Sequence, residues 1–237
     1  MLDFEQFHLA ASTADLTAEP AARPHADLVE FRMDLADAPL PALEAYEGDL
    51  PILVTNRPEW EGGEHPDGPE RREELLSAIE HPAVAAVDLE LRALEHPNEL
   101  TDLQPVLDRA READLAVIVS RHDFDRVPSR QTLLDQAQRA CRLGSVAKLA
   151  VTAAETDGVL DLLRVTQDLT KCGHTVATMA MGQAGAHSRA VAPLYGSKIG
   201  YAPIDPAEAT APGQFDLQTL AGLLDTFDVE RPADSKV

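Results

Sequence analysis

The chain has 237 residues, 44% of them hydrophobic, which is enough core for one barrel-sized domain to fold without disulfide bonds. Its 41 acidic and 20 basic residues give a formal net charge of −21, which argues against nucleic acid as a partner. No apolar run is long enough to span a bilayer and the N-terminus lacks a basic signal-peptide start, so we expect a cytoplasmic protein that does not act at a membrane.

Two further features of the composition carry expectations. Cys141 and Cys172 are too few for a disulfide framework and lack the spacing of a metal site, so we expect two reduced thiols. The acidic residues are spread along the chain and lysine is rare, a pattern typical of adaptation to high salt, where screening weakens self-repulsion. The alternative is an ordinary acidic protein from a low-salt organism.

Taken in chain order, eight short, mostly apolar runs have the length and composition of strands. They are residues 7–11, 26–31, 51–55, 84–89, 115–119, 146–150, 175–179 and 199–202. Helices are predicted at 39–46, 70–80, 99–112, from Ser129 onward, at 155–169 and at 215–227, and residues 58–69 form a loop rich in glycine and proline.

Nearly every predicted strand is followed by a helix, which indicates parallel strands that are buried on both faces. A doubly wound sheet also alternates in this way, but eight units in a chain of this length fit a closed barrel better. We therefore predict an α/β protein with a single (β/α)8 TIM-barrel domain in residues 1–229. The tail, residues 230–237, is expected to be frayed.

Charged and polar residues gather where the predicted strands end, which is where barrel enzymes hold their active sites. Lys148 lies inside the sixth strand. The others are Glu30, Arg32, Arg57, Asp88, Glu90, His122, Arg189 and Gln214. The regularity of this pattern predicts one site at the carboxyl end of the barrel.

Lys148 needs a reason to sit in the apolar run 146–150. An isolated ammonium costs several kcal/mol to bury, so it must be paired, reach solvent, or be kept neutral for chemistry. A desolvated lysine can lose its proton and attack a carbonyl, whereas arginine cannot. The alternative is a lysine at a strand end that reaches solvent.

A barrel mouth with one lysine, one histidine and several arginines suggests an anionic substrate that carries a carbonyl group. Lys148 would form an imine, His122 would move protons, and an arginine would hold a carboxylate or phosphate. Because a protonated imine makes the adjacent C–H acidic, both carbon–carbon cleavage and β-elimination of water remain open at this point.

Six sequence blocks, in family order, resemble type I 3-dehydroquinate dehydratase, the Schiff-base enzyme of the shikimate pathway. Together they span most of the chain from the second strand onward. They are Glu30-Phe31-Arg32-Met33-Asp34; Thr55-Asn56-Arg57 with Glu61-Gly62-Gly63; Ser120-Arg121-His122-Asp123-Phe124; Lys148-Leu149-Ala150; Met181-Gly182 with Ser188-Arg189; and Ala211-Pro212-Gly213-Gln214.

The resemblance implies a lyase that converts 3-dehydroquinate to 3-dehydroshikimate, in aromatic amino acid biosynthesis, through a lysine imine and without a metal ion or other cofactor. By position, Lys148 resembles the imine-forming residue and His122 the general acid/base. Glu61 resembles the carboxylate that orients and polarises His122; the alternative for Glu61 is a charged loop tip. The resemblance also hints at a homodimer.

The same resemblance implies a set of substrate-binding residues. Arg189 resembles the carboxylate clamp, and Gln214 closes the opposite side of the site. Glu30, Arg32 and Arg57 resemble the groups that hold the ring hydroxyls, although each arginine could instead form an ion pair at the barrel mouth. Thr210 stands where the family usually has serine. Ser12 is left outside the site, and Asp88 and Glu90 are candidate partners for Arg57 or Lys148.

Two other functions compete with this interpretation. Another imine-forming barrel lyase, such as an aldolase, would share Lys148 but would not need this set of residues around a carboxylated polyol. A non-catalytic barrel that binds a carboxylate ligand, or serves as an assembly surface, would need neither Lys148 nor His122 intact.

Overall fold

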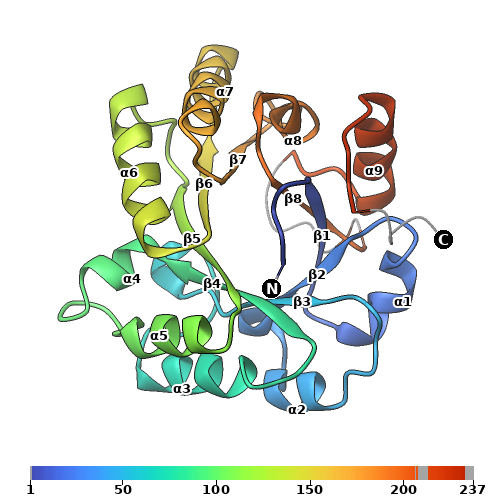
Figure 1. The fold of residues 1–237 in the computed structure, drawn as a ribbon, viewed down its shortest axis with the longest axis vertical. Helices are drawn as coiled ribbons and strands as arrows, with labels where there is room; N and C mark the ends of the chain where they lie inside the picture. The colour runs from blue at the N-terminus through green and yellow to red at the C-terminus, as the bar shows by residue number, and fades with distance from the viewer. Residues whose placement is uncertain (1, 206, 208–212, 233–237) are drawn as a thin grey trace.

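The structure of the chain, a computed structural model, describes residues 2–205, 207 and 213–232. Eight parallel strands form one sheet in the order β7-β6-β5-β4-β3-β2-β1-β8, and the helices lie outside them (Figure 1). The strands are β1 His8–Thr13, β2 Leu28–Arg32, β3 Ile52–Thr55, β4 Val84–Glu90, β5 Ala116–Asp123, β6 Val146–Thr152, β7 Val176–Met181 and β8 Ile199–Pro203.

The two outer strands, β7 and β8, meet and close the sheet into a barrel. An isolated parallel bridge joins Val176 to Ser197. The amide of Lys198 donates to the carbonyl of Val176 at 2.8 Å, and Ser197 Oγ accepts from the amide of Thr178 at 3.0 Å. The fold is therefore the single-domain (β/α)8 TIM barrel that the strand count predicts.

All eight predicted strands are confirmed, and most continue past their predicted carboxyl ends. The largest extension is in β5, which was predicted to end at residue 119 and runs on to Asp123. Polar side chains at strand ends make the hydropathy pattern look like a loop. Because β5 extends to Asp123, His122 lies on the strand and not in a loop, and it is in register with Ala150 of β6.

The helices match the prediction less closely. They are α1 Glu19–Ala22, α2 Pro39–Glu44, α3 Pro69–Ala78, α4 Leu91–Glu95, α5 Gln104–Glu112, α6 Arg130–Leu143, α7 Thr156–Lys171, α8 Ser188–Val191 and α9 Leu217–Thr226. The prediction for 99–112 began too early, because Pro105 lacks an amide hydrogen and marks the first turn of α5. Ser129 caps α6 as predicted, accepting from the amide of Thr132 at 3.2 Å. Of the helices described, none is long and apolar enough to cross a membrane.

Alternate residues of each strand point into the barrel, and their character changes along it. Residues near the amino ends, such as Leu28 in β2, Ile118 in β5 and Val146 in β6, form an apolar plug. Two positions further on, the same faces carry Glu30, Ser120 and Lys148. The outward faces pack under the helices, so the polar end of the interior is the only place where these charges can meet.

Residues 230 and 231, which lie just beyond the predicted end of the domain, contact the barrel. The carbonyl of Glu230 accepts from the amide of Phe7 at 3.2 Å, and the side chain of Arg231 is only 4% exposed. Arg231 donates to the carbonyl of His25 at 2.6 Å and pairs with Asp27 at 3.8 Å. This part of the tail is packed against the amino end of the barrel and belongs to the domain.

Candidate active site

One pocket opens at the carboxyl end of the barrel and collects nearly all of the predicted site residues. Thr210 lies outside the described residues. The pocket is lined by Ser12, Glu30, Arg32, Thr55, Arg57, Glu61, Gly62, His122, Phe124, Lys148, Ala150, Met179, Met181, Arg189, Tyr201 and Gln214. Residues from seven strands and the loops that follow them therefore converge on one volume.

Lys148 points into this pocket, not out to solvent: its side chain is 6% exposed. Its Nζ donates to Asp88 Oδ2 at 3.0 Å and lies 3.5 Å from Glu30 Oε1. Tyr201 covers it from the β8 side, with Nζ 4.0 Å from the centroid of the ring. The lysine is thus surrounded by two carboxylates and the face of an aromatic ring.

His122 lies on β5, the strand that pairs with β6 of Lys148, and is held by Glu61. Glu61 Oε1 accepts from the backbone amide of His122 at 2.8 Å and lies 3.3 Å from its Nδ1. The other oxygen, Oε2, pairs with Arg121 at 3.2 Å. Because Glu61 is 2% exposed, it is a buried partner of the histidine and not a charged loop tip.

The electrostatics of this pair leave His122 neutral and Glu61 ionised. Burial, reinforced by the nearby charge of Arg57, lowers the pKa of His122 to about 4. Burial works to raise the pKa of Glu61, but its hydrogen bonds with His122 and the charge of Arg57 hold that pKa below the usual value. At neutral pH the imidazole is therefore free to accept a proton.

The backbone after β3 explains why two glycines follow Glu61. Gly62 has φ of +81°, in the left-handed region, and ends the 3-10 turn Glu59–Glu61. A Cβ on Gly63 would lie 2.0 Å from the carbonyl oxygen of Arg57, so only glycine lets the loop fold back against the strand end. This tight return brings the Glu61 carboxylate to His122.

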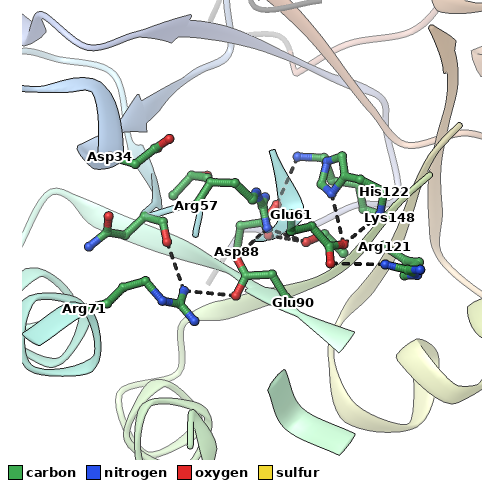
Figure 2. Close-up of polar contacts among 12 residues, drawn as sticks. Asp34, Arg57, Glu61, Arg71, Asp88, Glu90, Arg121, His122 and Lys148 are labelled. Atoms are coloured by element: carbon green, nitrogen blue, oxygen red, sulfur yellow. Dashed lines mark hydrogen bonds and ion pairs between the residues drawn. The ribbon is translucent and has the colours of Figure 1, made fainter. Parts of the chain in front are cut away.

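A buried charge network lies below the pocket (Figure 2). Arg57 Nη2 pairs with Asp88 at 2.7 Å, and its Nη1 pairs with Glu90 at 2.6 Å. The hydroxyl of Ser120 accepts from Arg57 at 2.8 Å and donates to Asp88 at 2.6 Å. Burial works to raise the pKa of Asp88, but Arg57 and Lys148 hold it well below its usual range. Asp88 and Glu90 are thus partners of Arg57, as the sequence suggested.

The three pocket arginines differ in how their charge is met. Arg32 forms two hydrogen bonds with Asp34, at 2.8 and 2.6 Å, and Arg57 is paired as described above. Arg189, from α8, is 5% exposed and has no ion pair with any described residue. Burial lowers its pKa to about 10, and its Nε has no hydrogen-bond partner among the residues that the structure describes. An unpaired, buried guanidinium at a pocket wall is a site for an anion.

Sequence reasoning misplaced or missed several pocket residues. Ser12 was expected to lie outside the site, yet it lines the pocket and donates to Glu30 Oε2 at 2.5 Å. It was missed because its role depends on β1 lying beside β2, where Ser12 is in register with Glu30. Phe124 stacks on the ring of His122, with centroids 5.8 Å apart. The motif around His122 contains this residue, but only the fold shows the stacking.

Taken together, the pocket offers an amine, a neutral imidazole oriented by a carboxylate, and a buried cation that has no counterion among the described residues. An amine can add to a carbonyl, and a neutral imidazole can remove a proton from the carbon next to the resulting imine. The cation favours a substrate with a negatively charged group on the β7–β8 side. The geometry is suited to imine chemistry on a small carboxylated ketone.

Comparison with known proteins supports this chemistry. The family model of type I 3-dehydroquinase matches residues 10–231. The 3-dehydroquinate dehydratases of Haloarcula marismortui and Halobacterium salinarum are 56% and 51% identical to the chain, over 94% of its length and 97% and 98% of theirs. The crystal structure of 3-dehydroquinate dehydratase from Geobacillus kaustophilus matches 96% of the chain and 93% of its own at 28% identity, with a TM-score of 0.81. The chain belongs to the type I 3-dehydroquinase family.

Proposed function

We propose that this pocket converts 3-dehydroquinate to 3-dehydroshikimate, with Lys148, His122 and Glu61 as its catalytic residues. As a member of the type I 3-dehydroquinase family, the chain is a hydro-lyase that acts through a lysine imine. The assignment of roles to individual residues rests on the geometry of the pocket.

In the first step, the neutral amine of Lys148 attacks the ketone of the substrate, and loss of water gives an imine. Asp88 and Glu30 lie 3.0 and 3.5 Å from Nζ, so the protonated, cationic imine is stabilised where it forms. This cation withdraws electrons from the adjacent carbon and makes its hydrogen acidic.

In the second step, His122 removes that hydrogen as a proton, and the electrons move onto the imine nitrogen to give an enamine. The electrons then return to expel the β-hydroxyl, which takes a proton from His122 and leaves as water. Glu61 keeps the imidazole in position and stabilises the charge that it carries between these transfers. Water finally hydrolyses the imine, which releases the product and restores Lys148.

The substrate is held by charge and by hydrogen bonds. We assign its carboxylate to Arg189, because this cation lines the pocket and has no carboxylate partner among the described residues. Glu30, Arg32 and Arg57 face the opposite wall and are assigned to the ring hydroxyls. Gln214 also lines the pocket, and Thr210 keeps its predicted role on the strength of the sequence alone.

The observation that carries the proposal is that Lys148 and His122, whose side chains are 6% and 12% exposed, line one pocket that also holds Arg189. The test is borohydride reduction in the presence of 3-dehydroquinate, followed by peptide mass spectrometry. We expect one covalent adduct on Lys148, its loss in Lys148→Met, and its retention in Lys171→Met, which alters an exposed lysine at the end of α7. No adduct at saturating substrate would overturn the proposal.

The same experiment addresses the rival functions. An aldolase would also give a Lys148 adduct, but with its own ketone or aldehyde substrate, and it would not turn over 3-dehydroquinate. A non-catalytic barrel would bind the carboxylate without forming any adduct. Formation of 3-dehydroshikimate, which absorbs in the ultraviolet because its double bond is conjugated, separates the dehydratase from both.

Three broader features also remain proposals. We propose a cytoplasmic location, in keeping with the two free thiols, Cys141 and Cys172. We propose a homodimer, which light scattering in concentrated salt would test.

Adaptation to high salt is supported by the relatives from halophilic archaea. The burial of charged residues also supports it. Among the described residues, six acidic and five basic side chains are buried, so the excess negative charge of these residues lies at the surface.

A further inference from the structure

Arg71 carries a charge that is completely buried outside the pocket. It lies in the first turn of α3, where most side chains face solvent, yet it is 0% exposed. Its guanidinium turns inward, toward the ends of β3 and β4, where Nη1 donates to the carbonyl of Asn56 at 3.0 Å (Figure 2). A buried cation of this kind must have partners that matter.

The main partner of Arg71 is Glu90, at the end of β4. Arg71 Nη1 donates to Glu90 Oε2 at 3.0 Å, and neither side chain has any exposure. The other oxygen of this carboxylate, Oε1, accepts from Arg57 Nη1 at 2.6 Å. Glu90 is therefore shared between an arginine from a helix and an arginine of the pocket wall.

Arg57 continues the chain of contacts to the reacting amine. Its Nη2 lies 2.7 Å from Asp88 Oδ1, and Asp88 Oδ2 accepts from Lys148 Nζ at 3.0 Å. Positive and negative groups thus alternate from α3 to the centre of the barrel. The order is Arg71, Glu90, Arg57, Asp88, Lys148 and Glu30.

The free energy of folding alone does not favour this series of buried ion pairs. Replacing a buried ion pair by well-packed apolar side chains is often neutral or stabilising, because each charge must lose its hydration. Within the part of the chain that the structure describes, Nε and Nη2 of Arg71 have no hydrogen-bond partner, although Nε lies 3.5 Å from Asp67 Oδ1. Arg71 is costly to bury, and ion pairs connect it to Lys148. This combination points to a role for Arg71 in the reaction.

We propose that Arg71 is a positioning residue: it neutralises Glu90 and so keeps Arg57 engaged with Asp88, the carboxylate that holds Lys148. Without Arg71, the Glu90 carboxylate would have Arg57 as its sole cation and would draw it away from Asp88. Asp88 would then turn more fully toward Lys148 and hold its amine away from the substrate carbonyl. The inference rests on the proposed role of Lys148.

The experiment compares single-turnover rates of imine formation, measured by borohydride trapping in concentrated salt. Arg71→Met removes the charge and keeps an apolar stem, and we expect trapping to slow by up to about 100-fold, the loss typical of a small misplacement of reacting groups. Arg71→Lys keeps a charge near Glu90, so it should recover most of the rate. Arg72→Met is the matched control, because Arg72 is its neighbour in α3 and pairs only with Glu73 among the described residues.

A double variant separates positioning from a purely structural role. In a Glu90→Gln background there is no carboxylate for Arg71 to neutralise, so adding Arg71→Met, or Arg71→Gln in both backgrounds where the methionine variant does not fold, should change the trapping rate less than twofold. An effect of the Arg71 substitution that depends on Glu90 in this way would show that Arg71 acts through Glu90.

Two outcomes would overturn the inference: trapping at the wild-type rate per folded molecule in Arg71→Met, or equal losses in the wild-type and Glu90→Gln backgrounds. A lower midpoint of thermal unfolding with an unchanged trapping rate would show a structural role only. Failure of the proposed function is distinct, because the wild-type protein would then give no Lys148 adduct at all.

Discussion

Glu61 holds His122 at two points: its Oε1 accepts from the backbone amide at 2.8 Å and lies 3.3 Å from the ring Nδ1. The first contact fixes the strand end, and the second fixes the tilt of the ring and its tautomer. With Nδ1–H directed at Glu61, the lone pair of Nε2 is left for the substrate. A histidine free to rotate would present its basic nitrogen only part of the time.

Replacing Glu61 by glutamine should therefore lower kcat more than it changes KM. We expect a loss of about 100-fold in kcat, since the amide can still accept from the His122 backbone but cannot stabilise an imidazolium. Steady-state kinetics with 3-dehydroquinate would measure both constants. Glu59→Gln, which changes an exposed residue of the same turn, is the control. A change confined to KM would contradict the assignment.

Replacing His122 by alanine should separate imine formation from the later steps. Turnover should fall by about 10²- to 10⁴-fold, the usual contribution of a general acid/base, while the Lys148 adduct should still be trapped. Near-normal turnover would remove His122 from the mechanism.

In the wild-type protein, the pKa of His122 of about 4 means that the neutral, active form persists at neutral pH and is lost only as the pH falls through about 4. The acid limb of kcat/KM should accordingly lie near pH 4, well below the ordinary histidine range.

The sequence was sufficient to predict the barrel and many of the residues that line the pocket at its mouth, because both follow from local patterns. Apolar runs at regular spacing specify strands, and polar residues at their ends, such as Lys148 and His122, specify the face that carries the chemistry. The family motifs then connected Glu61 to His122 across a loop whose path the sequence does not show.

What the sequence could not predict depends on which elements lie side by side. Arg71 resembles any other charged residue on a helix until α3 is packed against β4, where its partner is Glu90. Ser12 likewise has no visible role until β1 pairs with β2. The contacts of Arg231 could not be predicted for the same reason, since its partner Asp27 is far away in sequence.

Replacing Arg189 by methionine should weaken substrate binding and at the same time spare or raise stability. A charge-assisted contact to a carboxylate contributes about 1.5–3 kcal/mol, so KM should rise by roughly 10- to 100-fold. The buried guanidinium has no carboxylate partner among the described residues, so its removal relieves a desolvation cost. Thermal unfolding and steady-state kinetics would test the two effects together. Arg32→Met is the contrast, because it breaks the pair with Asp34 and should lower stability.

Concentrated salt should stabilise the folded protein. The chain carries a formal net charge of −21, and the buried charges of the described residues nearly cancel, so the excess negative charge of these residues lies at the surface. The folded state therefore repels itself in dilute buffer, where charges interact over about 10 Å at 0.1 M salt. Raising KCl to molar concentrations shortens this range to about 3 Å, and we expect the midpoint of thermal unfolding to rise by roughly 10 °C, equivalent to about 3 kcal/mol in the free energy of unfolding. Buried pairs such as Arg57 with Asp88 are shielded from these ions and should not weaken in turn. Sucrose at equal osmolality, which screens no charge, is the control. Full stability and activity in dilute buffer would show that the acidic surface is not an adaptation to salt.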